Sequence, residues 1–274
     1  MSQPNPLQKF FRQPKVYVSL PSKGLYYEPG SLIGDYNNVP VFAMSGMDEI
    51  IMKTPDALFT GEATAKVIES CCPYIKNAKT MPSIDIDALL IAIRIATFGD
   101  KMSVTHTCQK CESENEYEIE LGKLLDYFNS LKFVNAIAVS ESLTIRIRPL
   151  QYEEMSYFSI ENFKLQKTLF QTADLTDDTR QQQIDQIYKD LSELQLQLFL
   201  TAIESVQIEG MLVTEKVHIE EWLRNTERDT YKLIKTKLEE NKEAWSMPPN
   251  PILCSSCGAE NSITITLDQA NFFV

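Results

Sequence analysis

Apolar residues recur at helical spacing in the first part of the chain and predict three helices. The first covers about 46–53 behind Ser45, a residue type that caps helix N-termini, with Asp48 at its third position. The second covers about 61–72, where the apolar residues fall on one side. The third, 84–98, is apolar on every side, so we expect it to be buried on several faces at the centre of the first domain.

Alternation of polar and apolar residues predicts short strands on both sides of two cysteine motifs. Residues 102–107 and 116–121 flank the first motif, and residues 251–253 and 262–267 flank the second. Each motif is therefore predicted to lie at the turn of a β-hairpin. Other extended segments are predicted at 15–20, 39–43 and, as a hairpin, 134–148.

After Pro149 the pattern changes to helical spacing. Helices are predicted over 152–170, from Asp177 or Asp178 to about 205, over 214–222 and over 226–245. The fold class predicted from these elements is α+β and mainly α-helical, with a small antiparallel β zinc ribbon formed by N- and C-terminal segments around a helical insertion. The predicted organisation is a flexible arm over 1–14, a helical core with the ribbon over 15–150 plus 248–274, and an α-helical insertion over 151–247.

The two cysteine motifs share more than their C-x-x-C spacing. Cys108 and Cys111 are followed by Glu-Asn after two further residues, and so are Cys254 and Cys257. Two such turns supply four thiolates, which is the ligand number of a tetrahedral structural zinc site. We therefore predict one structural Zn²⁺ per chain on these cysteines. The long segment between the motifs leaves open whether the two pairs share one ion.

Other chemistry of these cysteines is less consistent with the pattern. A thioredoxin-like redox pair begins a helix after a strand, whereas both pairs here lie between predicted strands. A catalytic zinc site needs a position for water, which four thiolates do not leave. His106 lies two residues before Cys108 and is an alternative ligand, although the four cysteines favour a strand role for it.

Charge limits the classes of partner. The 274 residues include 38 acidic and 26 basic side chains, for a net charge of −12. A broad phosphate-binding surface needs clustered Lys and Arg, and the strand after the first motif instead carries five glutamates between 112 and 120. We therefore expect no nucleic-acid binding, although a zinc-ribbon nucleic-acid-associated factor remains the alternative from another functional class.

The sequence also bears on the compartment of the protein. It contains no apolar run of the length that a membrane span requires, and its first residues lack the apolar core of a signal peptide. Without a secretion signal, the six cysteines are expected in a reducing cytosol, where metal binding is favoured over disulfides.

The remaining candidate residues favour structural roles. Adjacent Cys71 and Cys72 are interpreted as one core thiol and one thiol at the core boundary, and Asp85 and Asp87 as first-turn acids of a helix rather than a catalytic pair. We find no glycine-rich phosphate loop and no nucleophile with a nearby base, which predicts a non-enzymatic protein. The apolar segment 272–274 fits either a docking peptide or a cover for the ribbon.

Several stretches resemble the hub subunits and hub assembly proteins of T-even-type phage baseplates. The resemblance covers about residues 16–150, including the first cysteine pair, and matches the later helical part only in character. It implies a structural or assembly role, without catalysis, in the hub of a contractile-tail baseplate. The stretches that carry it are Val18-Ser-Leu-Pro-Ser-Lys-Gly-Leu-Tyr26, Met44-Ser-Gly-Met-Asp-Glu49, Pro55-Asp-Ala-Leu58, Val67-Ile-Glu-Ser-Cys71, Asp85-Ile-Asp-Ala-Leu-Leu90, Ile93-Arg-Ile-Ala-Thr-Phe-Gly99 and Arg148-Pro-Leu150.

The resemblance also implies partners and a location. The expected partners are other tail and baseplate hub proteins, with the tape-measure protein among the candidates, and a tape-measure assembly chaperone is the alternative role. The expected location is the tail baseplate of the virion or the host cytoplasm during assembly. Oligomeric state, copy number and retention in the particle stay open.

Overall fold

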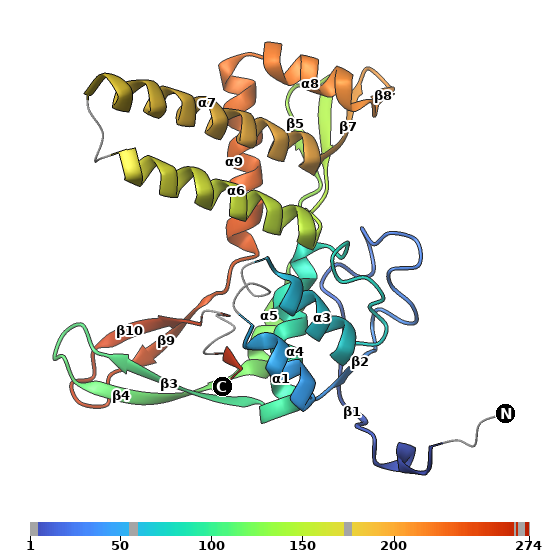
Figure 1. Ribbon diagram of the computed structural model, residues 1–274, viewed down its shortest axis with the longest axis vertical. Helices are drawn as coiled ribbons and strands as arrows, with labels where there is room; N and C mark the ends of the chain where they lie inside the picture. The colour runs from blue at the N-terminus through green and yellow to red at the C-terminus, as the bar shows by residue number, and fades with distance from the viewer. Residues whose placement is uncertain (1–4, 55–59, 173–176, 266, 268–271, 274) are drawn as a thin grey trace. The chain divides into compact units, whose positions relative to one another are not determined.

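The computed structural model describes residues 5–54, 60–172, 177–265, 267 and 272–273. The chain divides into two compact units, Met1–Leu131 with Ser246–Val274, and Lys132–Trp245. The fold is α+β, with 48% helix and small antiparallel sheets, as the sequence predicts (Figure 1). Within the described residues, no helix is long and apolar enough to cross a membrane.

The first unit is built around α4 (Ile86–Phe98), which the short 3₁₀ helix η2 (Ser83–Asp85) precedes. Nine of the α4 residues are buried, in agreement with the prediction of a central helix. It packs against α3 (Glu62–Cys71) and α5 (Leu121–Ser130). The strands β1 (Pro14–Val18) and β2 (Val39–Phe42) pair antiparallel and also contact α4.

Helix α1 (Gly46–Met52) begins as predicted. The Ser45 side chain accepts a hydrogen bond from the Asp48 N–H, and the Asp48 carboxylate accepts one from the Ser45 N–H, which forms a capping box. The Asp48 pKa is lowered, because these hydrogen bonds and the charge of Arg12 outweigh the effect of its burial.

The segment before β1 is anchored at one point. Residues Pro6–Phe10 form the 3₁₀ helix η1, none of whose residues is buried. Arg12 then donates to the Asp48 carboxylate at 3.0 Å, the Ala43 carbonyl at 2.7 Å and the Ser70 carbonyl at 2.7 Å. These bonds fix the chain at Arg12, inside the predicted flexible arm, whereas residues 1–4 lie outside the described part.

Asp85 has a role that the sequence interpretation missed. Instead of only complementing the α4 dipole, its carboxylate accepts hydrogen bonds from the Ser22 N–H at 2.7 Å, the Ser22 hydroxyl at 2.6 Å and the Tyr27 hydroxyl at 2.9 Å. The partners lie about 60 residues earlier in the chain, which helical periodicity does not reveal. Asp85 therefore holds the 20–27 loop against the end of the central helix.

The apolar residues near the C-terminus cover part of α4. Phe272 and Phe273 are both buried, and their rings meet edge to face at 5.1 Å. The Arg94 guanidinium lies 5.3 Å from the Phe272 ring centre and 5.0 Å from that of Phe98, a cation–π arrangement. Burial lowers the Arg94 pKa. The described phenylalanines thus belong to the core of the first unit, and Val274 lies outside the described residues.

The described part of the second unit combines a four-stranded antiparallel sheet with four α-helices. The sheet has the strand order β5-β6-β7-β8, formed by Ala136–Ala138, Leu143–Ile147, Ile203–Ile208 and Met211–Val213. The helices are α6 (Tyr152–Gln171), α7 (Asp177–Ala202), α8 (Lys216–Asn225) and α9 (Arg228–Ala244). Apolar side chains of α7, α8 and α9 form one core with the sheet, around Phe199, Ile145 and Ile234, and α6 packs against α7.

The hairpin at 134–148 forms as predicted, but it lies in the second unit. Its strand β6 pairs with β7, which ties it to the helical part of the chain rather than to the unit that contains α4. The unit boundary therefore falls at 131/132, whereas the sequence interpretation placed the change at about 150.

The strands β7 and β8 correct the predicted end of the long helix. Helix α7 stops at Ala202, and the Lys216 ammonium donates to the carbonyls of Leu200 and Ile203 at that end. The chain then forms a hairpin whose turn has positive φ at Glu209 and Gly210. Ile203 continues the apolar spacing of the helix, so the pattern alone extended the helix too far.

Candidate metal centre

Two β-hairpins carry the two cysteine pairs of the first unit. Strands β3 (Lys101–Thr107) and β4 (Glu114–Glu120) flank the first pair, and β9 (Pro249–Leu253) and β10 (Glu260–Thr264) flank the second. Both hairpins are antiparallel, which confirms the predicted strand–turn–strand plan. Figure 1 shows the two hairpins side by side.

The two turns have the same backbone geometry. In each, the N–H four residues after the first cysteine donates to that cysteine's carbonyl, at 2.9 Å for Glu112 and 2.8 Å for Gly258. Both donors have a left-handed φ, +58° and +69° respectively. In each, the first cysteine is buried and the second is exposed. The repeated motif thus folds into two equivalent turns.

The four sulfur atoms form one cluster. All lie within 4.8 Å of one another. The Cys108 and Cys257 sulfurs are 3.8 Å apart, and the Cys111 and Cys254 sulfurs are 3.6 Å apart. A tetrahedral zinc with Zn–S bonds of about 2.3 Å requires a sulfur–sulfur separation of about 3.8 Å. The structure therefore brings both pairs together at one position, where the four sulfurs could hold a metal ion.

Two asparagines connect the turns crosswise. The Asn115 side-chain amide donates to the sulfur of Cys254 in the other hairpin, and the Asn261 amide donates to the sulfur of Cys108, both at 3.5 Å. Asn115 also accepts a hydrogen bond from the Ser255 hydroxyl. The Glu-Asn repeated after each cysteine pair was the sequence signal for this role. Only the structure shows that each asparagine donates to a sulfur of the other hairpin.

Hydrogen bonds shift the pKa values of the cluster thiols in opposite directions. Backbone N–H groups of Cys111 and Lys110 lower the pKa of Cys108 to about 6, and the hydroxyl and N–H of Ser113 lower that of Cys111. An N–H of Ala259 favours the Cys257 thiolate, but hydrogen bonds with the neighbouring sulfurs, Cys111 first, raise its pKa to about 12. A cation bound among the sulfurs would favour the thiolate form of all four cysteines.

The outer face of the first hairpin is acidic, as predicted. On β4 the exposed positions are all glutamates, opposite Lys101, Ser103, Thr105 and Thr107 of β3. Lys101 pairs with Glu118 at 2.6 Å, and Lys123 pairs with Glu120 at 2.9 Å. This negative surface would repel a phosphate backbone.

The other sequence candidates lie outside the cluster. His106 is half-buried on β3 opposite Asn115, and the set of possible metal ligands within the described residues does not include it. Cys71 and Cys72 are fully buried, and burial raises the pKa of Cys71 to about 12. The expectation of a core thiol is confirmed, whereas the expectation that the second thiol lies at the core boundary is wrong, because both side chains are fully buried.

Comparison with known proteins identifies the family. No curated protein and no solved structure matches the chain. The family described as T4 bacteriophage base plate protein matches residues 42–274, a range that contains both cysteine pairs and the whole second unit. Since this match spans well over half of the chain, the protein belongs to the T4 bacteriophage base plate protein family.

Proposed function

We propose that the protein is a structural or assembly component of the hub of a contractile-tail baseplate, acting through protein–protein contacts without catalysis. The family match over residues 42–274 carries this proposal, because it indicates a structural baseplate role and a place in the phage tail. The hub position rests on the resemblance of residues 16–150. Chaperoning of the tape-measure protein is the alternative role.

Two features of the structure support a role in binding rather than catalysis. Leu7, Phe10 and Phe11 are 60%, 73% and 55% exposed, as expected of a segment that contacts another protein. The buried carboxylates have structural partners, since Asp48 caps α1 and Asp85 holds the 20–27 loop. These groups need no catalytic explanation.

Complex formation with tail proteins tests this proposal. The full chain is mixed with separately purified hub and tape-measure proteins of the same phage, and native mass spectrometry records the complexes. We expect a defined complex with at least one hub protein. Binding to the tape-measure protein alone would favour the chaperone role, and no complex with any tail protein would contradict the proposal.

We also propose that the sulfur cluster holds a structural Zn²⁺ and that the two hairpins form a zinc ribbon. The proposal is supported by the four thiol ligands and by sulfur separations of 3.6 and 3.8 Å, close to those of a tetrahedral zinc site. Four sulfurs would saturate the ion, so its role would be to join the hairpins. Elemental analysis of the purified chain should give about one zinc per chain, and none or two would contradict a single shared site.

The hydrogen bonds that Asn115 and Asn261 donate to cysteine sulfurs should increase the affinity for zinc. Replacing Asn261 by alanine removes an amide donor to the Cys108 sulfur, so we expect zinc affinity to fall by about 10- to 100-fold, as for other groups that hydrogen-bond to metal ligands. Competition with a zinc chelator measures the change. Ser262→Ala, at the next position of β10, is the control and should leave the affinity unchanged.

A further inference from the structure

One face of the sheet of the second unit is open to solvent at Arg146, Gln207 and Leu212. Its other face carries Ile137, Ile145 and Val206 into the hydrophobic core. On the open face, the strand register places Arg146 of β6 between Ala136 of β5 and Ser205 of β7. These neighbours are small, so the guanidinium at the middle of the sheet is accessible from solvent.

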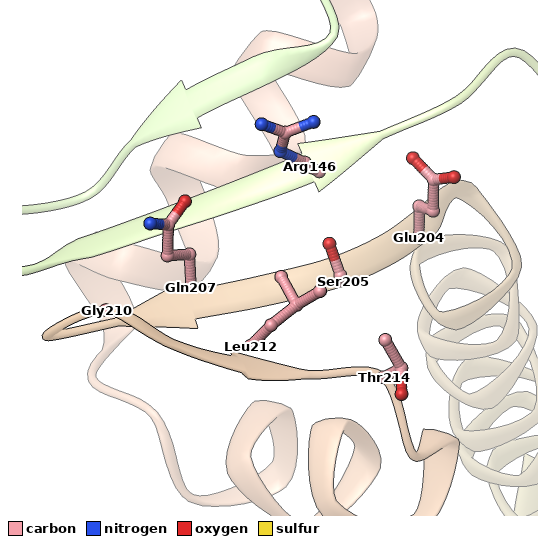
Figure 2. A pocket seen from close by; sticks show the side chains of 7 residues that line it. All are labelled: Arg146, Glu204, Ser205, Gln207, Gly210, Leu212 and Thr214. Carbon is pink, nitrogen blue, oxygen red and sulfur yellow. The ribbon is translucent and has the colours of Figure 1, made fainter.

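A hollow of about 440 Å³ lies over this face. Figure 2 shows that its side chains come from neighbouring strands and from the segment after β8. Leu212, at its rim, is 57% exposed, and the β6–β7 register is irregular where Glu204 lies. Bulges of this kind are common next to functional sites. The hollow is lined by Arg146, Glu204, Ser205, Gln207, Leu212 and Thr214.

Arg146 differs from nearby arginines in its electrostatic pairing. Arg148, two residues later, binds Glu154 through two nitrogens at 2.7 and 2.8 Å, and Arg224 pairs with Glu193 at 2.7 Å. Among the described residues, Arg146 has no ion pair, although the chain carries twelve more acidic than basic groups. The open face therefore presents a cation whose pairing with a carboxylate remains available.

We infer that this face, with Arg146 at its centre, is a docking surface for an acidic segment of another baseplate protein. An aspartate or glutamate of the partner would enter the hollow and accept hydrogen bonds from the guanidinium, and an apolar neighbour would contact Leu212. Charge complementarity identifies this occupant. The single guanidinium in the hollow suits one carboxylate, whereas a phosphate backbone needs several clustered cations. The charge of Glu204, also in the lining, interacts with that of Lys216. The inference rests on the proposed baseplate function and specifies one surface that serves it.

Charge reversal tests the surface. The full chain and its Arg146→Glu variant are titrated against each separately purified hub protein of the same phage. We expect binding to weaken by about 30-fold or more, because a carboxylate of the partner would lose its pairing inside the interface. Leu212→Asp, at the rim, should weaken the same complex, and Arg146→Lys should restore part of the affinity.

The matched control is Arg180→Glu, which makes the same charge change at an exposed arginine of α7 and should bind like the unaltered protein. Thermal melting checks folding, and Leu212→Asp serves as the deciding variant if Arg146→Glu is unstable. Equal binding by the unaltered chain and a folded variant at Arg146 or Leu212 would overturn the inference and leave the baseplate function intact. If the unaltered chain forms no complex with any hub protein, both the inference and the proposed hub function are overturned.

Discussion

Replacing Cys254 by serine is expected to abolish the proposed zinc binding and to detach the β9–β10 hairpin from the β3–β4 hairpin. Cys254 is buried, and its sulfur lies 3.6 Å from that of Cys111. Three remaining thiolates bind zinc far more weakly, so the stabilisation by the bound ion is lost. That stabilisation amounts to about 4 kcal/mol when free zinc exceeds its dissociation constant about 1,000-fold. Elemental analysis and urea unfolding, each at a fixed zinc concentration, measure the two effects.

The matched control changes a residue between ligands of the same site. Lys110→Ser lies in the first turn between Cys108 and Cys111, and its side chain is exposed. It should keep the full zinc content and the unfolding midpoint of the unaltered protein. If Cys254→Ser also keeps both, the thiol cluster does not hold a stabilising metal. If both variants lose stability equally, the turn itself rather than the metal is the source of the effect.

Detachment is expected because each hairpin has only two strands. A two-stranded hairpin is marginally stable alone in water and depends on contacts along one face. In the C-terminal hairpin, Ile263 is buried while Leu253 is 63% exposed, so a small apolar face is available to hold it. The crosslink through four sulfurs, with Asn115 and Asn261 beside it, would supply the rest. Limited proteolysis between 249 and 264 should therefore accelerate when zinc is removed.

Local periodicity predicted the features that depend on neighbouring residues. The burial of α4 follows from an unbroken apolar run, and the start of α1 follows from Ser45 and Asp48, three positions apart. The two cysteine turns were evident because the same short motif is repeated between alternating strands. In each case the signal lies within a few residues, where sequence spacing and spatial distance correspond.

The features that sequence analysis missed depend on distant partners or on competing local signals. Arg12 finds its acceptors more than 30 residues away, and the crosswise bonds of Asn115 and Asn261 span about 140 to 150 residues. Strand β7 follows directly on α7, and its first residue continues the helical apolar spacing. Helix α5 was not predicted, because it follows the alternating strand β4 directly. Glu120, at its N-cap position, also makes no side-chain capping hydrogen bond.

Asp85→Ala is expected to destabilise the first unit by about 3 kcal/mol, because it leaves the N–H and hydroxyl of Ser22 and the hydroxyl of Tyr27 without their acceptor. Ser22 is only 4% exposed, so water replaces that acceptor poorly. Asp87→Ala is the control, since Asp87 occupies the first turn of the same helix. It should not destabilise the unit, because burial raises the pKa of Asp87 to about 6 and so disfavours its charged form. Equal losses in the two variants would show that both acids act only on the helix.

The pH dependence separates the charge of Asp85 from its hydrogen bonds. Burial raises the pKa of Asp85 to about 6 in the folded chain, although the hydrogen bonds from Ser22 and Tyr27 act in the opposite direction. The unfolded value is about 3.9. Between these values the folded chain binds more protons than the unfolded chain, so this group's contribution to stability falls as the pH rises.

Asp85→Asn keeps the shape of the protonated acid and has no such titration. The free energy of unfolding of this variant should therefore rise relative to that of the unaltered protein, by about 2 kcal/mol between pH 4 and pH 7. Urea unfolding of both proteins across this range measures the difference, and the thiols, common to both, cancel in it. A difference that stays constant or changes in the opposite direction would mean that the fold accommodates the ionised carboxylate without penalty. The rise would show instead that the 20–27 loop is held by the ionised carboxylate of Asp85. It would also show that the free-energy cost of burying this charge exceeds the stabilisation from its hydrogen bonds with Ser22 and Tyr27.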